Sequence, residues 1–175
     1  MTWINTVSYE ESAGDLRNLY DRIKGPDNNV DNIMLAHSLR PHTMQGHMTL
    51  YKYVLHHPRN ALPKAYLEAI GVYVSSLNDC QYCVEHHFAG MARLLNDDKR
   101  AANIREALQN HMPADAFSGA ELAGLDDGEI LEINQVTAYF SYANRTVLGL
   151  GVATDGDIIG LSPGDSSDPD NWSHA

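Results

Sequence analysis

Apolar residues recur every three or four positions over most of this chain, and that spacing is typical of α-helices. The pattern is clearest between residues 64 and 77, where Leu67, Ile70, Val74 and Leu77 share one face. No stretch alternates between apolar and polar residues in the way that predicts a half-buried strand. The sequence therefore predicts an all-α fold, a single-domain helical bundle.

Glycine, proline and capping residues divide this pattern into seven predicted helices. Ser12 or Asp15 is a suitable cap for the first, and Asp126 or Asp127 for the last. Pro41 breaks the chain before the third helix, and Pro63 suits the start of the fourth. The predicted helices cover residues 12–24, 31–39, 42–56, 64–77, 80–95, 99–110 and 127–147.

The end of the chain has a different composition, rich in Gly, Asp, Ser and Pro. We expect a helical domain over residues 1–150 and an irregular tail over residues 151–175, with one short extended segment near residues 157–161. Trp172 is the one bulky apolar residue of this tail. It predicts that the tail docks, either on its own chain or on a neighbouring subunit.

Charge and length exclude several classes of function. The 175 residues suffice for one domain, and their formal net charge is −11. A surface this acidic disfavours nucleic acids and anionic membranes as partners. No apolar run reaches the roughly 18 residues of a membrane span, and the first residues do not resemble a signal peptide. We therefore expect a cytoplasmic protein.

The two cysteines of the chain, Cys80 and Cys83, form a C-x-x-C motif at the start of the fifth predicted helix. Residues three or four positions apart share a helix face, so the two thiols meet and His87 lies beside Cys83. A helix start and a cationic histidine both lower a cysteine pKa. A contact with His87 predicts the lower pKa for Cys83. His86 points away from this face.

Glu68 is a candidate partner for His87. If residues 75–79 form the turn of an antiparallel hairpin, Glu68 and His87 lie at similar distances from that turn, roughly 16 and 12 Å along their helices. Glu68 also lies beside an apolar stripe, where a carboxylate needs a partner. Glu68, His87 and Cys83 thus form a candidate proton relay.

Simpler explanations compete with this one. A lone C-x-x-C in a helical protein is often accidental, and Glu68 alone is readily explained as a partly solvated acid. The upstream histidines either line a pocket or lie on the surface, and the surface is the more ordinary place for them: His37, His42, His47 and His56.

A metal centre or a haem fits the motif less well than redox chemistry does. Structural zinc sites use four ligands, usually in two separated pairs. Here the two consecutive histidines, His86 and His87, point about 100° apart on a helix and do not both reach an ion held by the cysteines. Haem attachment requires C-x-x-C-H, but Val84 occupies the fifth position. We therefore expect no metal and no cofactor.

The spacing Glu68, eleven residues, Cys80-x-x-Cys83, three residues, His87 resembles the signature of the alkylhydroperoxidase D group, within the carboxymuconolactone decarboxylase-like superfamily. The stretches "YLEAIGVYVSSLNDCQYCVEHH" and "AHSLRPHTMQGHMTLYKYVLHHP" look more narrowly like its uncharacterised peroxidase-related enzymes. The resemblance covers roughly residues 3–150.

That resemblance implies a helical homo-oligomer: a dimer, trimer or hexamer. It implies that Cys83 forms a sulfenic acid, that Cys80 resolves it to a disulfide, and that Glu68 and His87 relay protons. In the group, a histidine stands between the cysteines, and here Tyr82 takes that place. A phenol with a pKa of ~10 is a poor base at neutral pH but can donate a hydrogen bond. Tyr82 and His86 are therefore auxiliary candidates.

The activity that follows is a thiol-dependent, peroxidase-like reduction of hydroperoxides, with a peroxide as substrate and an external dithiol as reductant. Two alternatives stay open at this point. One is a lactone decarboxylase or related acid–base enzyme that uses Glu68 and His87 and does not need the cysteines. The other is a redox sensor that is oxidised once and does not turn over.

Overall fold

The computed structural model describes residues 2–112, 124–163 and 171–172, and within them it contains seven α-helices and no β-strand. The all-α prediction is therefore confirmed. The helices are α1 (Gly14–Ile23), α2 (Asn32–Leu35), α3 (Pro41–Leu55), α4 (Lys64–Leu77), α5 (Gln81–Leu95), α6 (Asp98–Gln109) and α9 (Asp127–Leu150), with one 3-10 turn, η1 (Pro26–Asn28).

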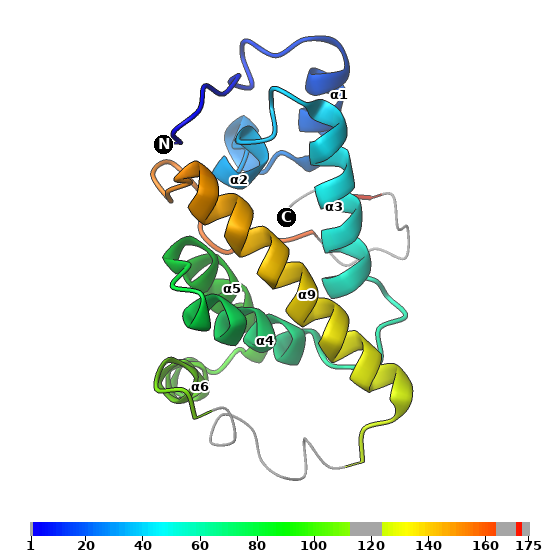
Figure 1. Cartoon of the computed structure of the whole chain (residues 1–175), viewed down its shortest axis with the longest axis vertical. Helices are drawn as coiled ribbons and strands as arrows, with labels where there is room; N and C mark the ends of the chain where they lie inside the picture. Colours follow the sequence, from blue (N-terminus) through cyan, green and yellow to red (C-terminus); the bar gives the residue numbers. More distant parts are fainter. Residues whose placement is uncertain (1, 113–123, 164–170, 173–175) are drawn as a thin grey trace.

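Helix α9 is the longest element and crosses the molecule between α3 and the α4–α5 pair (Figure 1). One core cluster joins the apolar faces of α1, α3, α4 and α9, with Tyr20, Met48, Leu67 and Phe140 among its buried side chains. A second cluster lies between α4, α5 and α6. Helix α4 contributes to both clusters and so fixes the position of α5, which carries the cysteines.

Most predicted boundaries agree with the structure within a few residues, and three differ. Helix α1 begins at Gly14, because the Ser12 hydroxyl donates to the Tyr9 carbonyl and does not cap the helix. Helix α2 covers only Asn32–Leu35, and turns follow it up to Pro41. Helix α9 extends to Leu150 and ends at Gly151, whose φ of 64° is left-handed. Asp126 caps α9, as predicted.

The described part of the tail packs on its own chain. The Asn32 side-chain amide donates to the carbonyls of Ala153 and Asp155, and Trp172 is buried in the first core cluster. Residues 159–160 form a turn, closed by the Leu161 N–H donating to the Ile158 carbonyl, so the predicted extended segment is wrong. The remainder of the predicted tail, residues 164–170 and 173–175, lies outside the described residues.

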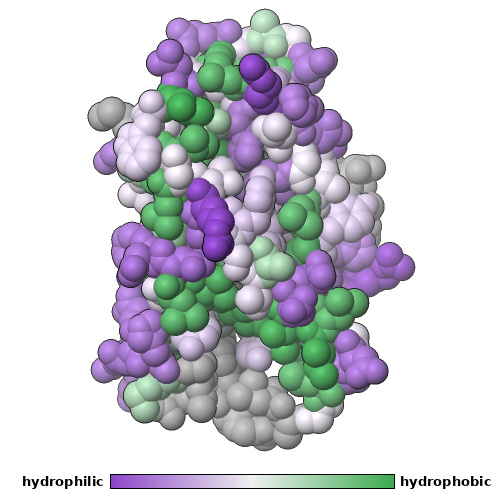
Figure 2. All heavy atoms as spheres, in the orientation of Figure 1, coloured by the Kyte–Doolittle hydropathy of each residue, from purple (hydrophilic) through white to green (hydrophobic). Residues whose placement is uncertain are grey.

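Several large apolar side chains are exposed on the surface. Figure 2 shows apolar surface over the lower part of the face that is in view. Ile130 and Leu131 are the exposed large apolar residues at the start of α9. Surfaces of this kind occur at subunit contacts, and the predicted homo-oligomer stays a prediction. None of the described helices combines the length and the hydropathy needed to cross a bilayer.

At Gly71, α4 packs directly against the Phe140 ring of α9. A Cβ atom at Gly71 would overlap the ring of Phe140, which is fully buried. We expect Gly71→Ala to lower the free energy of unfolding by about 1–3 kcal/mol, as overpacked cores do. The control is Gly46→Ala in α3, where a Cβ meets nothing within 4 Å and a gain of about 0.5–1 kcal/mol is expected. Urea denaturation measures both, and equal effects of the two changes would contradict the tight contact.

Candidate functional site

The two thiols lie together at the start of α5. Cys80 is the N-cap residue and Cys83 lies in the first turn, with their Sγ atoms 3.0 Å apart. Both side chains are buried. The Asn144 side chain, from α9, donates to the Ser75 hydroxyl at 3.0 Å, and both groups lie close enough to hydrogen-bond the thiol pair. The predicted meeting of the two thiols on one helix face is observed.

The two thiols differ in acidity. The hydrogen bond shared with Cys83 lowers the pKa of Cys80, against the opposite effect of burial. The same hydrogen bond, burial and the charge on Cys80 raise the pKa of Cys83 well above its ordinary value. The sequence predicts the reverse order through a contact between Cys83 and His87. In the described part of the chain no hydrogen bond joins those two residues, and the hydrogen bond that His87 makes runs from Nδ1 to Glu68.

Glu68 and His87 form the contact that the helical hairpin predicts. His87 Nδ1 lies 2.6 Å from Glu68 Oε2, and the Glu68 side chain is 3 % exposed. Burial raises the pKa of Glu68, but the adjacent His87, together with His56 and Arg93, outweighs it, so that the pKa is lowered. Gly90 of α5 lies beside this carboxylate, where an added Cβ would be in ordinary van der Waals contact with the Glu68 oxygens at 3.6 Å. Glu68 is thus held as a buried carboxylate.

His56 is a second neighbour of Glu68 that sequence reasoning assigned to the surface. Its Nε2 atom lies 3.7 Å from Glu68 Oε1, and its side chain is 4 % exposed. Burial lowers the pKa of His56 to about 4, so the ring is neutral at physiological pH. His47 is also buried, with a pKa lowered by burial to about 3, and contacts the Tyr139 hydroxyl at 3.3 Å. For these two residues the surface interpretation is wrong.

The remaining upstream histidines are less enclosed. His42 is exposed on α3, and His37 is half-buried with its Nδ1 atom 2.9 Å from the Thr43 hydroxyl. A polar residue at the position of His47, between Met44 and Met48 on the apolar face of α3, is a signal that the sequence carries. His56, just after the end of that helix, offers no such signal.

Tyr82 and His86 face a carboxylate from the tail. The Tyr82 hydroxyl donates to Asp157 Oδ2 at 2.8 Å, and the same oxygen lies 3.3 Å from His86 Nε2. The Asn32 backbone N–H donates to Asp157 Oδ1 at 2.9 Å. Burial and the charge of Asp157 raise the pKa of Tyr82 well above its ordinary value, so it stays a neutral phenol. Tyr82 therefore holds Asp157 in place and does not act as a base.

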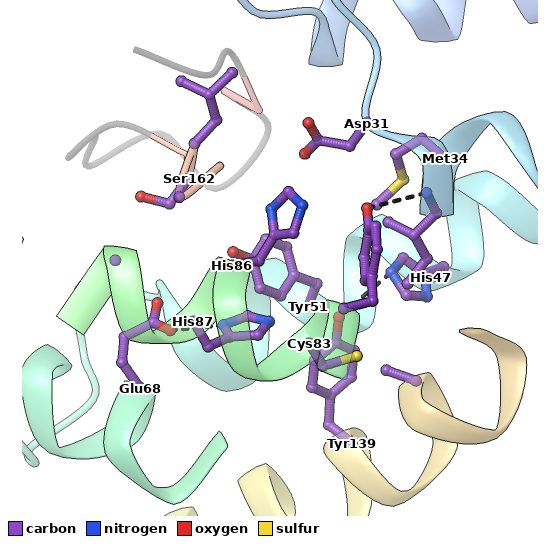
Figure 3. Close-up of a pocket in the computed structure, with 16 residues that line it drawn as sticks. Asp31, Met34, His47, Tyr51, Glu68, Cys83, His86, His87, Tyr139 and Ser162 are labelled. Carbon is purple, nitrogen blue, oxygen red and sulfur yellow. Dashed lines mark hydrogen bonds and ion pairs between the residues drawn. The ribbon is translucent and has the colours of Figure 1, made fainter. Parts of the chain in front are cut away.

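These groups surround one small cavity, of about 40 Å³. A water molecule needs roughly 10–15 Å³ by this measure, so the cavity has room for about three waters or one small solute. Figure 3 shows Cys83, His87, His86 and Asp31 on its wall, with Tyr51, Tyr139 and His47 completing it. Cys80 does not line this cavity but a separate surface hollow beside Asp79 and His111.

A metal would need a different arrangement of ligands. Among the described residues no three His, Cys, Asp or Glu side chains are placed to hold an ion together. Lys and Arg are missing from the described wall of the cavity. The site therefore offers carboxyl groups, histidines and one thiol to a bound molecule, without a Lys or Arg for an anionic one.

Residues 41–125 match the sequence model of the carboxymuconolactone decarboxylase family. This region includes all four residues of the signature: Glu68, Cys80, Cys83 and His87. This part of the chain, just under half of it, is therefore similar to the carboxymuconolactone decarboxylase family. No curated protein is similar enough in sequence to match it.

Two solved structures are similar to this one over most of the chain. One, from Ralstonia eutropha JMP134, is described as an alkylhydroperoxidase AhpD core, an uncharacterized peroxidase-related protein. It is 19 % identical, with a TM-score of 0.62, over 87 % of this chain and 91 % of that one. An uncharacterized peroxidase-related protein from Silicibacter sp. TM1040 is 20 % identical, with a TM-score of 0.65 and the same coverage. At these identities the likeness establishes the fold.

Glu68 can be replaced by glutamine, which has nearly the same shape and no charge. In a Cys80→Ser background, Glu68→Gln should raise the apparent pKa of Cys83, because the cavity wall then has no charged group paired with His87 to take part in moving the thiol proton. We expect a rise of about one pH unit, or roughly tenfold slower alkylation near neutrality. Stopped-flow alkylation as a function of pH measures it. Glu106→Gln, on the exposed face of α6, is the control; an unchanged profile for Glu68→Gln would limit Glu68 to a structural role.

Proposed function

We propose that this protein is a cytoplasmic, thiol-dependent, peroxidase-like oxidoreductase that reduces hydroperoxides through Cys80 and Cys83. The observation that carries the proposal is the contact of the two thiols at 3.0 Å, with Cys83 on the wall of a cavity that the Glu68–His87 pair also lines. The description of both structural neighbours as peroxidase-related supports it.

In the proposed reaction the Cys83 thiolate attacks one peroxide oxygen. An S–O bond forms, the O–O bond breaks, Cys83 becomes a sulfenic acid and the other oxygen leaves as water or an alcohol. Cys80 then attacks the Cys83 sulfur, so that a disulfide forms and water departs. Disulfide formation needs an approach of only about 1 Å from the observed contact. An external dithiol restores both thiols by exchange.

The ionisation of the thiol pair fits this order of events. Cys80 is the more acidic thiol, and its sulfur is in contact with Cys83. A Cys80 thiolate can accept the Cys83 proton across that contact, which leaves the thiolate on the sulfur that faces the cavity. The Glu68–His87 pair, 2.6 Å apart, stabilises and relays the proton that leaves the site.

Turnover is the decisive test. Hydrogen peroxide and excess dithiothreitol are mixed with the wild-type protein and with a Cys80→Ser/Cys83→Ser double variant. We expect wild type to consume many equivalents of peroxide per chain and the double variant none above the buffer rate. Consumption of a single equivalent per chain would instead identify a redox sensor that does not turn over.

The acid–base alternative is less compatible with the cavity. A carboxylated lactone is far larger than the solutes that fit about 40 Å³, and the described wall provides Asp31 and Glu68 but no Lys or Arg to hold its carboxylates. Lactone decarboxylation that persists in the double cysteine variant would favour this alternative.

A further inference from the structure

A second group of ionisable side chains contacts the cavity, separate from the Glu68–His87 pair. His86 and Asp31 line the wall, and Asp157 lies behind them with its side chain 1 % exposed. In Figure 3 the His86 ring lies next to Asp31. Asp31 and Asp157 come from segments on either side of the region that matches the family, residues 41–125.

Asp157 is fixed so that it holds the His86 ring. It accepts hydrogen bonds from the Tyr82 hydroxyl and the Asn32 backbone N–H, at 2.8 and 2.9 Å. Its Oδ2 atom lies 3.3 Å from His86 Nε2, which is an ion-pair contact, and Nε2 has no hydrogen bond to the described residues. The Tyr82 ring stacks on His86 with centroids 4.5 Å apart. The His86 ring is therefore positioned by the Tyr82 ring on its face and by the Asp157 carboxylate at its edge.

The proposed reaction needs a proton at this place. When the Cys83 sulfur attacks, the O–O bond breaks and its electron pair stays on the leaving oxygen. That oxygen departs as hydroxide or alkoxide unless an acid protonates it. Cys80 and the Glu68–His87 pair handle the proton that comes off the thiol. His86, three residues after Cys83 on α5, lines the same cavity as the thiol.

We propose that His86, positioned by Asp157 and Tyr82, donates the proton to the leaving oxygen of a peroxide bound at Cys83. The inference rests on the proposed peroxidase function and adds a residue and a role to it. His86 is the proton donor, and Asp157 and Tyr82 are positioning residues. After transfer the leaving group departs as water or an alcohol, and the neutral His86 takes up a proton again.

Asp31 is placed to supply that proton. Burial raises its pKa to about 7, with the charge of Asp157 adding to the rise and that of His86 opposing it. A buried carboxyl group that titrates near neutrality holds a proton for part of the time at physiological pH and exchanges it readily. Asp31 and His86 therefore form a short route by which the cavity recovers its proton between turnovers.

The test compares oxidants whose leaving groups differ in basicity. Hydrogen peroxide releases hydroxide, a strong base that leaves slowly unless an acid protonates it. Peracetic acid releases acetate, the anion of an ordinary carboxylic acid with a pKa of roughly 4, which leaves without a proton. In single-turnover experiments, His86→Gln should slow the oxidation of Cys83 by hydrogen peroxide about 100-fold. The oxidation by peracetic acid and the alkylation by iodoacetamide should change by no more than about twofold, since neither requires that proton.

Three variants accompany this measurement. Asp157→Asn and Tyr82→Phe should each slow the oxidation of Cys83 by hydrogen peroxide, but less than His86→Gln does. Neither should change the reactions with peracetic acid and iodoacetamide. If His86→Gln fails to fold, these two variants carry the test. His42→Gln, on the exposed part of α3, should behave as wild type with all three reagents.

The outcomes separate the inference from the function on which it rests. Equal losses with hydrogen peroxide, peracetic acid and iodoacetamide would mean that His86 only supports the structure, and no loss with any reagent would exclude a role. Either result overturns the inference while wild-type activity stands. A wild-type protein that reacts with both oxidants no faster than a free thiol would overturn the peroxidase function itself, and this inference with it.

Discussion

Replacing Cys83 by serine should abolish peroxide consumption, whereas replacing Cys80 by serine should stop turnover but leave one sulfenic acid on Cys83. Access to the peroxide decides the first result. Cys83 lines the cavity, whereas Cys80 lines a separate surface hollow. A thiolate at Cys80 has no route to a peroxide bound beside Glu68 and His87. Resolution decides the second, because the sulfenic acid has no neighbouring thiol once Cys80 is lost.

The acidity of the pair adds a second expectation. The hydrogen bond to Cys80 and the charge on Cys80 are two of the three causes that raise the pKa of Cys83. Cys80→Ser removes the charge, so the pKa of Cys83 should fall and its alkylation near neutral pH should become faster. In wild type, Cys80 is the more acidic thiol. It should be alkylated before Cys83 only if the reagent can enter the surface hollow that Cys80 lines.

Dimedone labelling after peroxide treatment, read by peptide mass, distinguishes the two thiols. Cys80→Ser should carry the label on residue 83, and Cys83→Ser should stay unlabelled and consume no peroxide. Label on residue 80 in Cys83→Ser would invert the assignment of roles. Equal labelling of the two variants would remove the case for a dedicated peroxide-reactive thiol.

The Glu68–His87 contact could be predicted because it depends only on local rules. Two amphipathic helices joined by a short turn form a hairpin, and residues at similar distances from the turn then become neighbours. The thiol contact follows from the three-residue spacing within one helix. Both inferences use geometry that a single helix or hairpin fixes, whatever the rest of the chain does.

The groups that complete the site come from distant segments, and helical periodicity does not reach them. Asp157 meets Tyr82 across 75 residues, and it belongs to an irregular tail with no repeating pattern. His56 becomes a neighbour of Glu68 only because the loop after α3 returns over α4. Asn144 carries a detectable signal, since it is a polar residue beside Ala143 and Val147 on the buried face of α9.

The order of the two thiol pKa values illustrates a different limit. The sequence places a histidine one turn after Cys83 and so suggests a direct contact. In the structure that histidine is already bonded to Glu68, and each thiol has the other as its strongest partner. Which partner each group meets depends on how α4 and α5 pack in three dimensions, and the spacing within one helix does not give that packing.

Asp31→Asn should stabilise the protein above pH 7 by up to about 4 kcal/mol and have little effect below pH 4. The pKa of Asp31 rises from 3.8 to about 7 on folding, chiefly through burial, with Asp157 of the tail adding to the rise and His86 of α5 opposing it. Between these two values the folded state binds more protons than the unfolded state, so stability falls as pH increases. At about 1.36 kcal/mol per pH unit, that interval gives the expected difference.

Asparagine has nearly the same shape and carries no charge, so it avoids the cost of a buried carboxylate at high pH. Thermal or urea unfolding of wild type and Asp31→Asn at several values between pH 4 and pH 8 measures the difference, which should grow up to about pH 7 and then level off. Asp27→Asn, at an exposed position of η1, should give a small difference that does not vary with pH. A pH-independent difference for Asp31→Asn as well would show that Asp31 ionises in the folded protein as it does in the unfolded chain. Burial at the cavity wall would then not be what controls its proton.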